Sequence, residues 1–268
     1  MAQRRSQGMT SRRFFSTLAA TLVLGLSPAL RAADAPVYEL RIYTTNEGKL
    51  PDLLKRFREH TCEIFQRHGI ENIAYWTPIA KEDGAENTLI YIIKHPSRDA
   101  AKKNWAEFQS DPEWKKVREA SEANGKILAK APESIFMTAT EYSPEVKVGA
   151  GTSPRIFEYR TYHTAEGKLD ALQARFKNHT IELFKKHGMT NLGYFTPTDK
   201  EKGLGNTLIY FLAHPSKEDA RKNFDAFRKD PDWVKAKAES EKDGTLTLAQ
   251  PDGVKSIYMQ ATDFSPMK

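Results

Sequence analysis

Cysteine is nearly absent from this sequence, which has Cys62 as its only thiol among 268 residues. An intramolecular disulfide is therefore impossible, and so is a metal site built from several thiolates. We interpret Cys62, which lies in a predicted helix, as a structural thiol that packs like a small hydrophobe. The fold must consequently be stabilised by its apolar core.

Several motifs of enzymes and metal sites are also missing. There is no glycine-rich phosphate loop, nucleophile elbow, catalytic-triad signature, Cys-x-x-Cys pair or His-x-x-x-His pair. His60 and His68 are eight residues apart, about two helical turns, so their rings are badly placed to chelate one ion. The sequence therefore predicts no metal site and no cofactor.

An acidic excess is lacking as well, and the basic excess is confined to one end of the chain. The formal charge is +6, from 41 basic and 35 acidic residues. The first 33 residues hold five arginines and no acidic residue, so the remainder of the chain is close to neutral. A nucleic-acid-binding face needs clustered basic residues, and we therefore expect no nucleic-acid partner.

The N-terminal segment has the pattern of an export signal. Ser11-Arg12-Arg13-Phe14-Phe15 precedes an apolar run over residues 16–26, and small residues lead up to Ala32-Ala33. The paired arginines resemble the twin-arginine signal, and the run is too short and too interrupted for a stable membrane span. We expect residues 1–33 to be a cleaved twin-arginine signal peptide and the protein to be periplasmic or secreted. An ordinary secretory signal is the alternative.

The rest of the chain contains one unit twice, at an offset of 119 residues. The matching segments are Tyr38 to Tyr43 with Phe157 to Tyr162, Glu47 to Leu50 with Glu166 to Leu169, His68-Gly69 with His187-Gly188, Asn87 to Tyr91 with Asn206 to Tyr210, and His95-Pro96-Ser97 with His214-Pro215-Ser216. The second copy gains three residues near its end, so Ser134 corresponds to Ser256. A period this long indicates duplicated domains. We place the domains at 37–144 and 155–266, with a flexible linker at 145–154.

Each unit is predicted to fold as β-α-β-β-α-α-β. In the first copy we expect strands at 37–43, 73–77, 88–94 and 134–142, and helices over 50–65, 97–108 and 112–124. This order is close to the ferredoxin-like split βαβ, which carries helices on one face and leaves the other face of its sheet to be covered. We therefore predict an α+β fold of two tandem ferredoxin-like units, whose antiparallel sheets pack face to face as one α/β barrel within the chain.

The motifs together resemble the NIPSNAP family, which belongs to the dimeric α/β-barrel group. They are Tyr-Glu-Leu-Arg-Ile-Tyr followed by Glu-Gly-Lys-Leu, a helix ending in His-Gly, and a strand ending in Trp-Thr-Pro. The resemblance covers both copies and implies the ferredoxin-like barrel. It implies little about chemistry, because NIPSNAP proteins are mostly discussed as binding or scaffold proteins in vesicle transport and mitochondrial quality control. We expect no cofactor; the alternative is a haem bound through a histidine, as in some other proteins of this group.

The candidate site residues are a Glu-Arg-Tyr trio on the first strand of each copy and a tyrosine on the second strand. Alternation places each trio on one strand face, opposite an apolar face that we expect under the helices, so that paired sheets would enclose the trios. Glu can act as acid or base, Arg can hold a carboxylate and Tyr can donate a hydrogen bond. A buried Glu–Arg pair that fixes strand register is the alternative. The candidate ligand-binding residues are Glu39, Arg41, Tyr43, Tyr75, Glu158, Arg160, Tyr162 and Tyr194.

These observations favour a protein of undetermined activity that binds a small organic ligand between its two sheets. One alternative is a cofactor-independent barrel oxygenase or isomerase acting on a small aromatic or oxygenated substrate. Another is a non-catalytic structural or interaction module with a filled barrel. The two copies are expected to form a pseudo-dimer within one chain, and a further homo-oligomer is left open.

Overall fold

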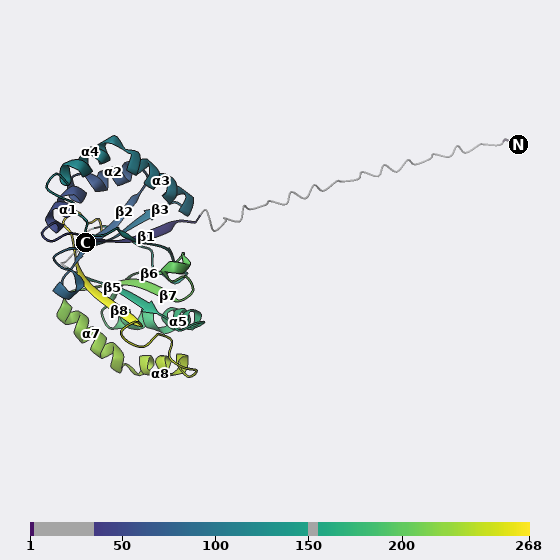
Figure 1. Ribbon diagram of the computed structural model, residues 1–268. Coiled ribbons are helices and arrows are strands. Elements are labelled where there is room, and N and C mark those ends of the chain that lie inside the picture. Colours follow the sequence, from purple (N-terminus) through teal and green to yellow (C-terminus); the bar gives the residue numbers. More distant parts are fainter. Residues whose placement is uncertain (3–34, 150–154) are drawn as a thin grey trace. The chain divides into compact units, whose positions relative to one another are not determined.

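Two copies of one β-α-β-β-α-α-β unit follow each other along the chain in the computed structural model (Figure 1). The structure describes residues 1–2, 35–149 and 155–268. The predicted signal peptide beyond its second residue and residues 150–154 of the predicted linker lie outside the described residues.

The first copy has the predicted order of elements, with one addition. A π-helical turn, η2, interrupts the long helix expected over 50–65 and divides it into α1 and α2. The elements are β1 (Val37–Thr44), α1 (Leu50–Arg56), η2 (Phe57–Thr61), α2 (Cys62–Arg67), β2 (Glu71–Pro78), η3 (Lys81–Asp83), β3 (Thr88–His95), α3 (Arg98–Ser110), α4 (Pro112–Ser121) and β4 (Glu133–Ala139).

The second copy repeats this order, including the π-helical turn. Its elements are β5 (Ile156–His163), α5 (Leu169–Arg175), η4 (Phe176–Thr180), α6 (Ile181–Lys186), β6 (Thr190–Pro197), η5 (Lys200–Lys202), β7 (Thr207–His214), α7 (Lys217–Lys229), α8 (Pro231–Ser240) and β8 (Val254–Ala261). No helix within the described residues combines the length and the apolar character that crossing a membrane requires.

The ends of the helices follow from local sequence. Ser97 accepts a hydrogen bond from the backbone N–H of Ala100 at 3.0 Å and so caps the N-terminus of α3. Asp111 caps α4 in the same way, and Pro112 occupies the first turn, where a missing N–H costs nothing. Gly69 ends α2 with a φ of +70°, which a residue without a Cβ adopts easily.

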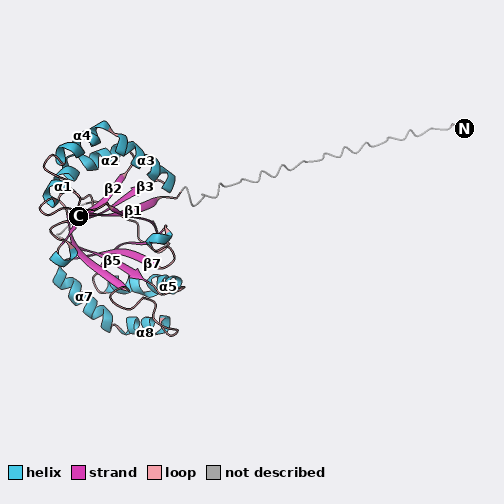
Figure 2. Ribbon diagram, viewed as in Figure 1, coloured by secondary structure: helices cyan, strands magenta, loops and turns pink. Residues whose placement is uncertain are grey.

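The eight strands form one closed barrel in the order β1-β3-β2-β8-β5-β7-β6-β4 (Figure 2). The two four-stranded halves are joined at both edges. Trp76 of β2 pairs with Ala261 of β8, and Met137 of β4 pairs with Pro197 of β6, all in antiparallel register. Closure leaves no free sheet edge, and it confirms the predicted barrel within one chain.

The C-terminal segment of each copy packs on the other copy. Phe264, which follows β8, stacks on Phe57 of the first copy with ring centroids 6.4 Å apart, and Arg58 forms an ion pair with Asp263 at 2.6 Å. Reciprocally, Tyr142 lies 5.8 Å from Tyr194 of the second copy, measured between ring centroids. Each half therefore completes the core of the other.

The face of β1 that points into the barrel is the opposite of the predicted one. Leu40 and its neighbours Tyr38 and Ile42 pack in the barrel interior, whereas Tyr43 packs against the helices. The interior is filled by apolar side chains that are almost inaccessible to solvent. They include Trp76, Ile90, Met137, Phe157, Phe195, Phe211 and Met259.

The prediction that the Glu-Arg-Tyr trios line the space between the sheets is therefore wrong. Alternation did group Glu39, Arg41 and Tyr43 on one strand face. That face is covered by helices, because the wholly apolar face is the one that can fill a dry barrel interior without leaving charges unpaired.

Candidate functional site

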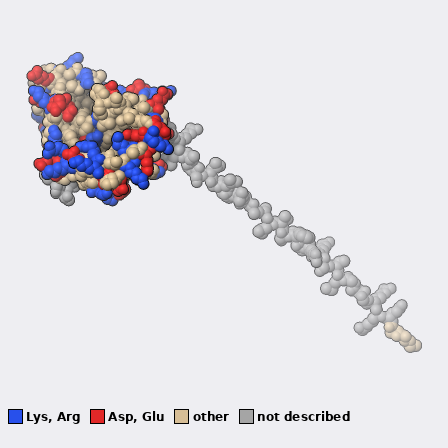
Figure 3. Space-filling view, turned by 90° about the horizontal axis from the view of Figure 1, so that it is seen from below, with Lys and Arg blue, Asp and Glu red and all other residues tan. Residues whose placement is uncertain are grey.

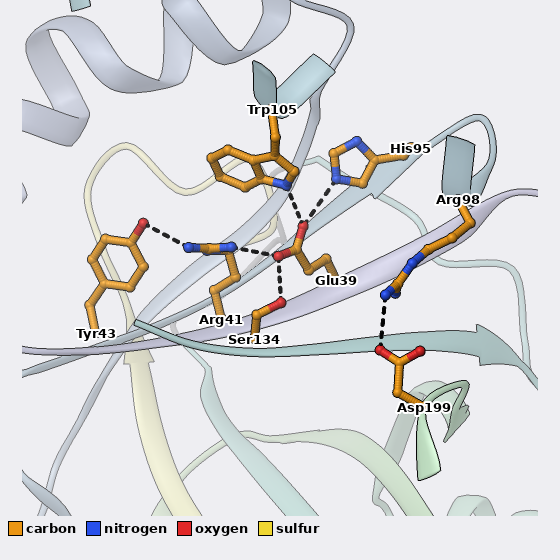
Figure 4. Close-up of polar contacts among 8 residues, drawn as sticks. All are labelled: Glu39, Arg41, Tyr43, His95, Arg98, Trp105, Ser134 and Asp199. Atoms are coloured by element: carbon orange, nitrogen blue, oxygen red, sulfur yellow. Dashed lines mark hydrogen bonds and ion pairs between the residues drawn. The ribbon is translucent and has the colours of Figure 1, made fainter. Parts of the chain in front are cut away.

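A buried hydrogen-bond network surrounds Glu39 between β1 and the helices of the first copy (Figure 4). Glu39 is 0% exposed to solvent. Its carboxylate accepts hydrogen bonds from three side chains, and a histidine Nε2 lies close by. The four atoms and their distances are Arg41 Nη1 (2.5 Å), Ser134 Oγ of β4 (2.6 Å), Trp105 Nε1 of α3 (2.7 Å) and His95 Nε2 of β3 (3.2 Å). The network joins β1 to both neighbouring strands and to α3.

The network keeps Glu39 ionised. Burial by itself would raise the pKa of Glu39, but hydrogen bonding to His95, the charge of Arg41 and the donors Ser134 and Trp105 outweigh burial and lower the pKa to about 2. Such a carboxylate neither gives nor takes a proton near neutral pH. Its role is to hold the guanidinium of Arg41 in place.

The second copy has the same network with one donor fewer. Glu158 is also 0% exposed. It accepts hydrogen bonds from Arg160 Nη1 at 2.6 Å and Ser256 Oγ at 2.5 Å, and His214 Nε2 lies 2.9 Å away. Phe224 occupies the position of Trp105, and the guanidinium carbon of Arg160 lies 4.9 Å from the centroid of its ring. The pKa of Glu158 is lowered as well, since its partners outweigh the effect of burial.

The tyrosines among the predicted site residues are also placed by the structure. Tyr43 and Tyr162 each accept a hydrogen bond from the arginine of their own trio, at 3.3 Å in both copies. Tyr75 and Tyr194 are fully buried under the helices, and each hydroxyl bonds to an asparagine side chain of its own strand. Tyr75 and Tyr194 are therefore core residues.

A cleft of about 590 Å³ reaches Arg41 from the helical side of the first copy. This volume lies within the range of roughly 300–1,000 Å³ that is usual for small-molecule sites. Aromatic rings form much of its wall, and three arginines line it. The lining aromatic residues are Tyr43, Phe57, Phe65, Trp105, Phe108 and Trp114, and the arginines are Arg41, Arg56 and Arg118. We call this space the first-copy cleft.

The π-helical turn η2 shapes one side of this cleft. Thr61 Oγ1 donates a hydrogen bond to the carbonyl oxygen of Arg56 at 3.1 Å within this turn. Single π-helical turns of this kind occur often at functional sites. The turn places Arg56 at the end of α1 and Phe57 beside it, and both line the cleft.

The arginines of the first-copy cleft are only partly paired. Glu122 lies 3.6 Å from Arg56, and the Nε atoms of Arg41 and Arg56 are buried without a hydrogen-bond partner among the described residues. Arg118 is exposed and forms no ion pair within the part of the chain that the structure describes.

The counterparts of these cleft residues in the second copy are joined by ion pairs. Glu241, the counterpart of Glu122, lies 2.7 Å from Arg175 and 3.0 Å from Lys237. Lys237 is the counterpart of Arg118. One carboxylate thus engages both cations in the second copy, whereas in the first copy one of the two is left without a carboxylate partner in the described residues.

Four of the histidines use Nε2 in contacts with carboxylates. His95 and His214 present Nε2 to buried glutamates, and His68 and His187 present Nε2 to Asp111 and Asp230 at 2.7 Å. A haem ligand needs an imidazole nitrogen facing an open cleft, so these four side chains do not fit that role. Within residues 35–149 and 155–268, no group of acidic, histidine and cysteine side chains is arranged to hold a metal ion.

Sequence reasoning missed several residues of this site. His95 and Ser134 are present in both copies, and this recurrence in the repeat could have indicated their role. Trp105 and Arg118 carried a different signal, because the copies differ there: Phe224 and Lys237 take their places. Comparing the two copies position by position would have found all four.

Comparison with known proteins gives a family and a fold. The family model described as NIPSNAP matches residues 38–144 and 157–266. A Fusobacterium nucleatum protein provisionally named a monooxygenase has a similar structure, with a TM-score of 0.56 and 12% identity over 85% of this chain and 92% of that one. A provisionally named monooxygenase from Lactobacillus acidophilus gives a TM-score of 0.53 and 11% identity over 85% and 94%.

A NIPSNAP family protein of unknown function from Agrobacterium tumefaciens is 21% identical, with a TM-score of 0.36 over 45% of this chain and 100% of that one. No curated protein matches the chain. The two structures with TM-scores of 0.56 and 0.53 support the barrel fold alone.

Proposed function

This chain belongs to the NIPSNAP family, and from that premise and the geometry of its first copy we propose that it binds a small aromatic carboxylate in the first-copy cleft. The observation that carries the proposal is the group of three arginines, Arg41, Arg56 and Arg118, in a cleft with an aromatic wall.

The charge of the cleft indicates one negative charge on the ligand. Arg41 is balanced by Glu39 at 2.5 Å and Arg56 by Glu122 at 3.6 Å. Arg118 has no carboxylate partner in the described part of the chain, so one positive charge is left over. A single carboxylate balances it, and the planar guanidinium can bind both oxygens of that group.

The wall of the cleft indicates an aromatic body. The indole of Trp105 lies 4.4 Å from the guanidinium carbon of Arg41, measured to the ring centroid, and the ring of Trp114 lies 4.5 Å from that of Phe108. Flat aromatic ligands pack favourably on such rings in offset or edge-to-face arrangements. A ligand of this kind would bury its ring against Trp105 and Trp114 and direct its carboxylate to Arg118.

Binding is favoured over catalysis by the state of the glutamates. An oxygenase or isomerase of the kind considered from the sequence would use Glu39 or Glu158 to transfer protons. Both have a lowered pKa, and each carboxylate accepts hydrogen bonds from an arginine and a serine side chain. A general base works best with a pKa near the working pH, which neither group has.

The test is a titration of the full chain with benzoate, followed by tryptophan fluorescence. We expect saturable quenching, no comparable response to uncharged benzyl alcohol, and an affinity that falls about tenfold in Arg118→Gln. Arg118 is exposed, so this variant should fold normally.

Lys237→Gln is the matched control, because Lys237 is the counterpart of Arg118 and is engaged by Glu241. It should leave benzoate affinity unchanged. Equal affinity in Arg118→Gln and wild type, or equal responses to benzoate and benzyl alcohol, would refute the proposal.

A further inference from the structure

The second copy has a groove of about 630 Å³ beside α7. It lies between α7 and β8 and reaches Arg160 of β5. Its cations come from two elements, Arg160 of β5 and Lys217, Arg221 and Arg228 of α7. Figure 3 views the barrel from the side of the second copy's helices, where Lys and Arg side chains are numerous. We call this space the second-copy groove.

The charges of the groove do not cancel. Arg160 is balanced by Glu158 at 2.6 Å, and Arg228 forms an ion pair with Asp225. The one acidic residue of the lining, Glu218, is engaged by Lys222 at 2.9 Å. Lys217 and Arg221 form no ion pair with any described carboxylate, and the carboxylate of Asp83 acts on Lys217 only over a longer distance. Two cations of the groove are therefore without an ion-pair partner.

The remaining lining residues complete a binding site. Tyr258 of β8 lies beside Lys217, whose Nζ is 5.7 Å from the centroid of the phenol ring. Burial raises the pKa of Tyr258 to about 12, so its hydroxyl is a hydrogen-bond donor at neutral pH. Phe224 forms the floor beside Arg160 and has no polar atom to compete for the guanidinium.

In the first copy the counterpart of Lys217 is neutralised by an ion pair. Arg98, the counterpart of Lys217, forms an ion pair with Asp199 at 3.0 Å (Figure 4). The guanidinium carbon of Arg98 also lies over the ring of Phe136, 3.5 Å from its centroid. The larger indole of Trp105 replaces Phe224, and Gln109 replaces Arg228. The two copies thus differ in the residues that surround their buried glutamate–arginine pairs.

We propose that the second-copy groove is an anion site, separate from the first-copy cleft, that takes a doubly charged oxyanion such as the phosphate group of a phosphorylated small molecule. The two cations without an ion-pair partner match its charge, and Arg221 and Arg228 offer the planar donors that bind phosphate oxygens in pairs.

The experiment is calorimetric titration of the full chain with inorganic phosphate at mildly alkaline pH, where phosphate is mainly a dianion. We expect one saturable site and an affinity at least about tenfold higher than for acetate. The double variant Arg221→Gln/Arg228→Gln should weaken phosphate binding about tenfold or more. Both residues are exposed, and circular dichroism verifies the fold of the variant.

The matched control is Lys102→Gln, since Lys102 is the counterpart of Arg221 in the first copy. It should leave phosphate binding unchanged. The proposal is overturned if phosphate does not bind saturably, if acetate binds equally well, or if the double variant binds like the wild type. Loss of phosphate binding in Arg118→Gln instead would place the anion in the first-copy cleft and overturn it too.

Discussion

The indole N–H of Trp105 donates a hydrogen bond to the buried carboxylate of Glu39 over 2.7 Å. The same indole covers the guanidinium of Arg41 and lines the first-copy cleft. Because Phe224 stands at the equivalent position, only the first copy has this link between its glutamate and its helical layer. One side chain therefore contributes to stability, to the ionisation of Glu39 and to the shape of the cleft.

Trp105→Phe should lower the free energy of unfolding by about 2 kcal/mol, because hydrogen bonds to charged groups contribute roughly 1.5–3 kcal/mol. Urea denaturation at neutral pH measures the change. Trp233→Phe is the control, since no hydrogen bond from its indole joins it to another described side chain. Equal losses in the two variants would show that the contact with Glu39 contributes nothing.

The stability of the chain should fall in acid through Glu39. The folded pKa of about 2 is below the ordinary value of 4.5, so the stabilisation is present above pH 4.5 and is lost as pH falls towards 2. The shift corresponds to about 3 kcal/mol. Asp111 titrates in the same range, so the informative quantity is the difference between wild type and Glu39→Gln.

Glu39→Gln should be less stable than wild type near neutral pH, because it leaves Arg41 buried without its counter-charge, and the difference should shrink as pH falls. A difference that stays constant between pH 4.5 and 2 would contradict the lowered pKa. Stability at each pH can be measured by urea denaturation.

Because the C-terminal segment of each copy packs on the other copy, the two copies should unfold together. Phe264→Ala removes a ring that packs on Phe57 and Tyr75 of the other copy, and we expect a loss of about 2–4 kcal/mol. The exposed Leu204 provides the control variant Leu204→Ala, with little expected effect. Circular dichroism and tryptophan fluorescence should report one coincident transition. Two separate transitions would show that the copies are independent.

Cys62 should be nearly inert in the folded chain. Burial raises the pKa of its thiol to about 11, so little thiolate exists near neutral pH. A chromogenic disulfide reagent should react about a hundredfold more slowly with the native chain than with the urea-unfolded chain. Comparable rates in the two states would mean that the thiol is accessible and acidic.

We also propose that the chain is exported by the twin-arginine route. Replacing Arg12 and Arg13 by lysine should retain the precursor inside the cell, because that route requires the arginine pair. Cell fractionation of a bacterial host measures the distribution. Unchanged export of the lysine variant would favour an ordinary secretory signal.

The repeat and the barrel could be predicted from the sequence for a physical reason. A duplicated β-α-β-β-α-α-β unit leaves one sheet face uncovered, and the second copy is the nearest surface that can cover it. The strand, helix and cap positions followed from apolar periodicity and from residues such as Ser97 and Gly69. The π-helical turns were not predicted, because the apolar residues between Leu50 and Phe65 also fit regular α-helical spacing.

The orientation of the first strand could not be predicted in the same way. Alternation shows that Glu39, Arg41 and Tyr43 share one face of the strand. Both faces of this strand are buried, however: one faces the barrel interior and the other faces the helices. Which face lies under the helices depends on side chains, distant in sequence, that can form hydrogen bonds with Glu39. His95, Trp105 and Ser134 supply those partners on the helical side.

The most direct test of the proposed site is an NMR titration that follows the four indole N–H signals while benzoate is added. Trp105 and Trp114 line the first-copy cleft, Trp76 lies in the barrel interior, and Trp233 is the counterpart of Trp114 in the second copy. We predict saturable shifts of the Trp105 and Trp114 signals, with those of Trp76 and Trp233 unchanged. A shift of the Trp76 signal without that of Trp105, or no shift at all, would contradict a ligand site between the sheet and the helices of the first copy.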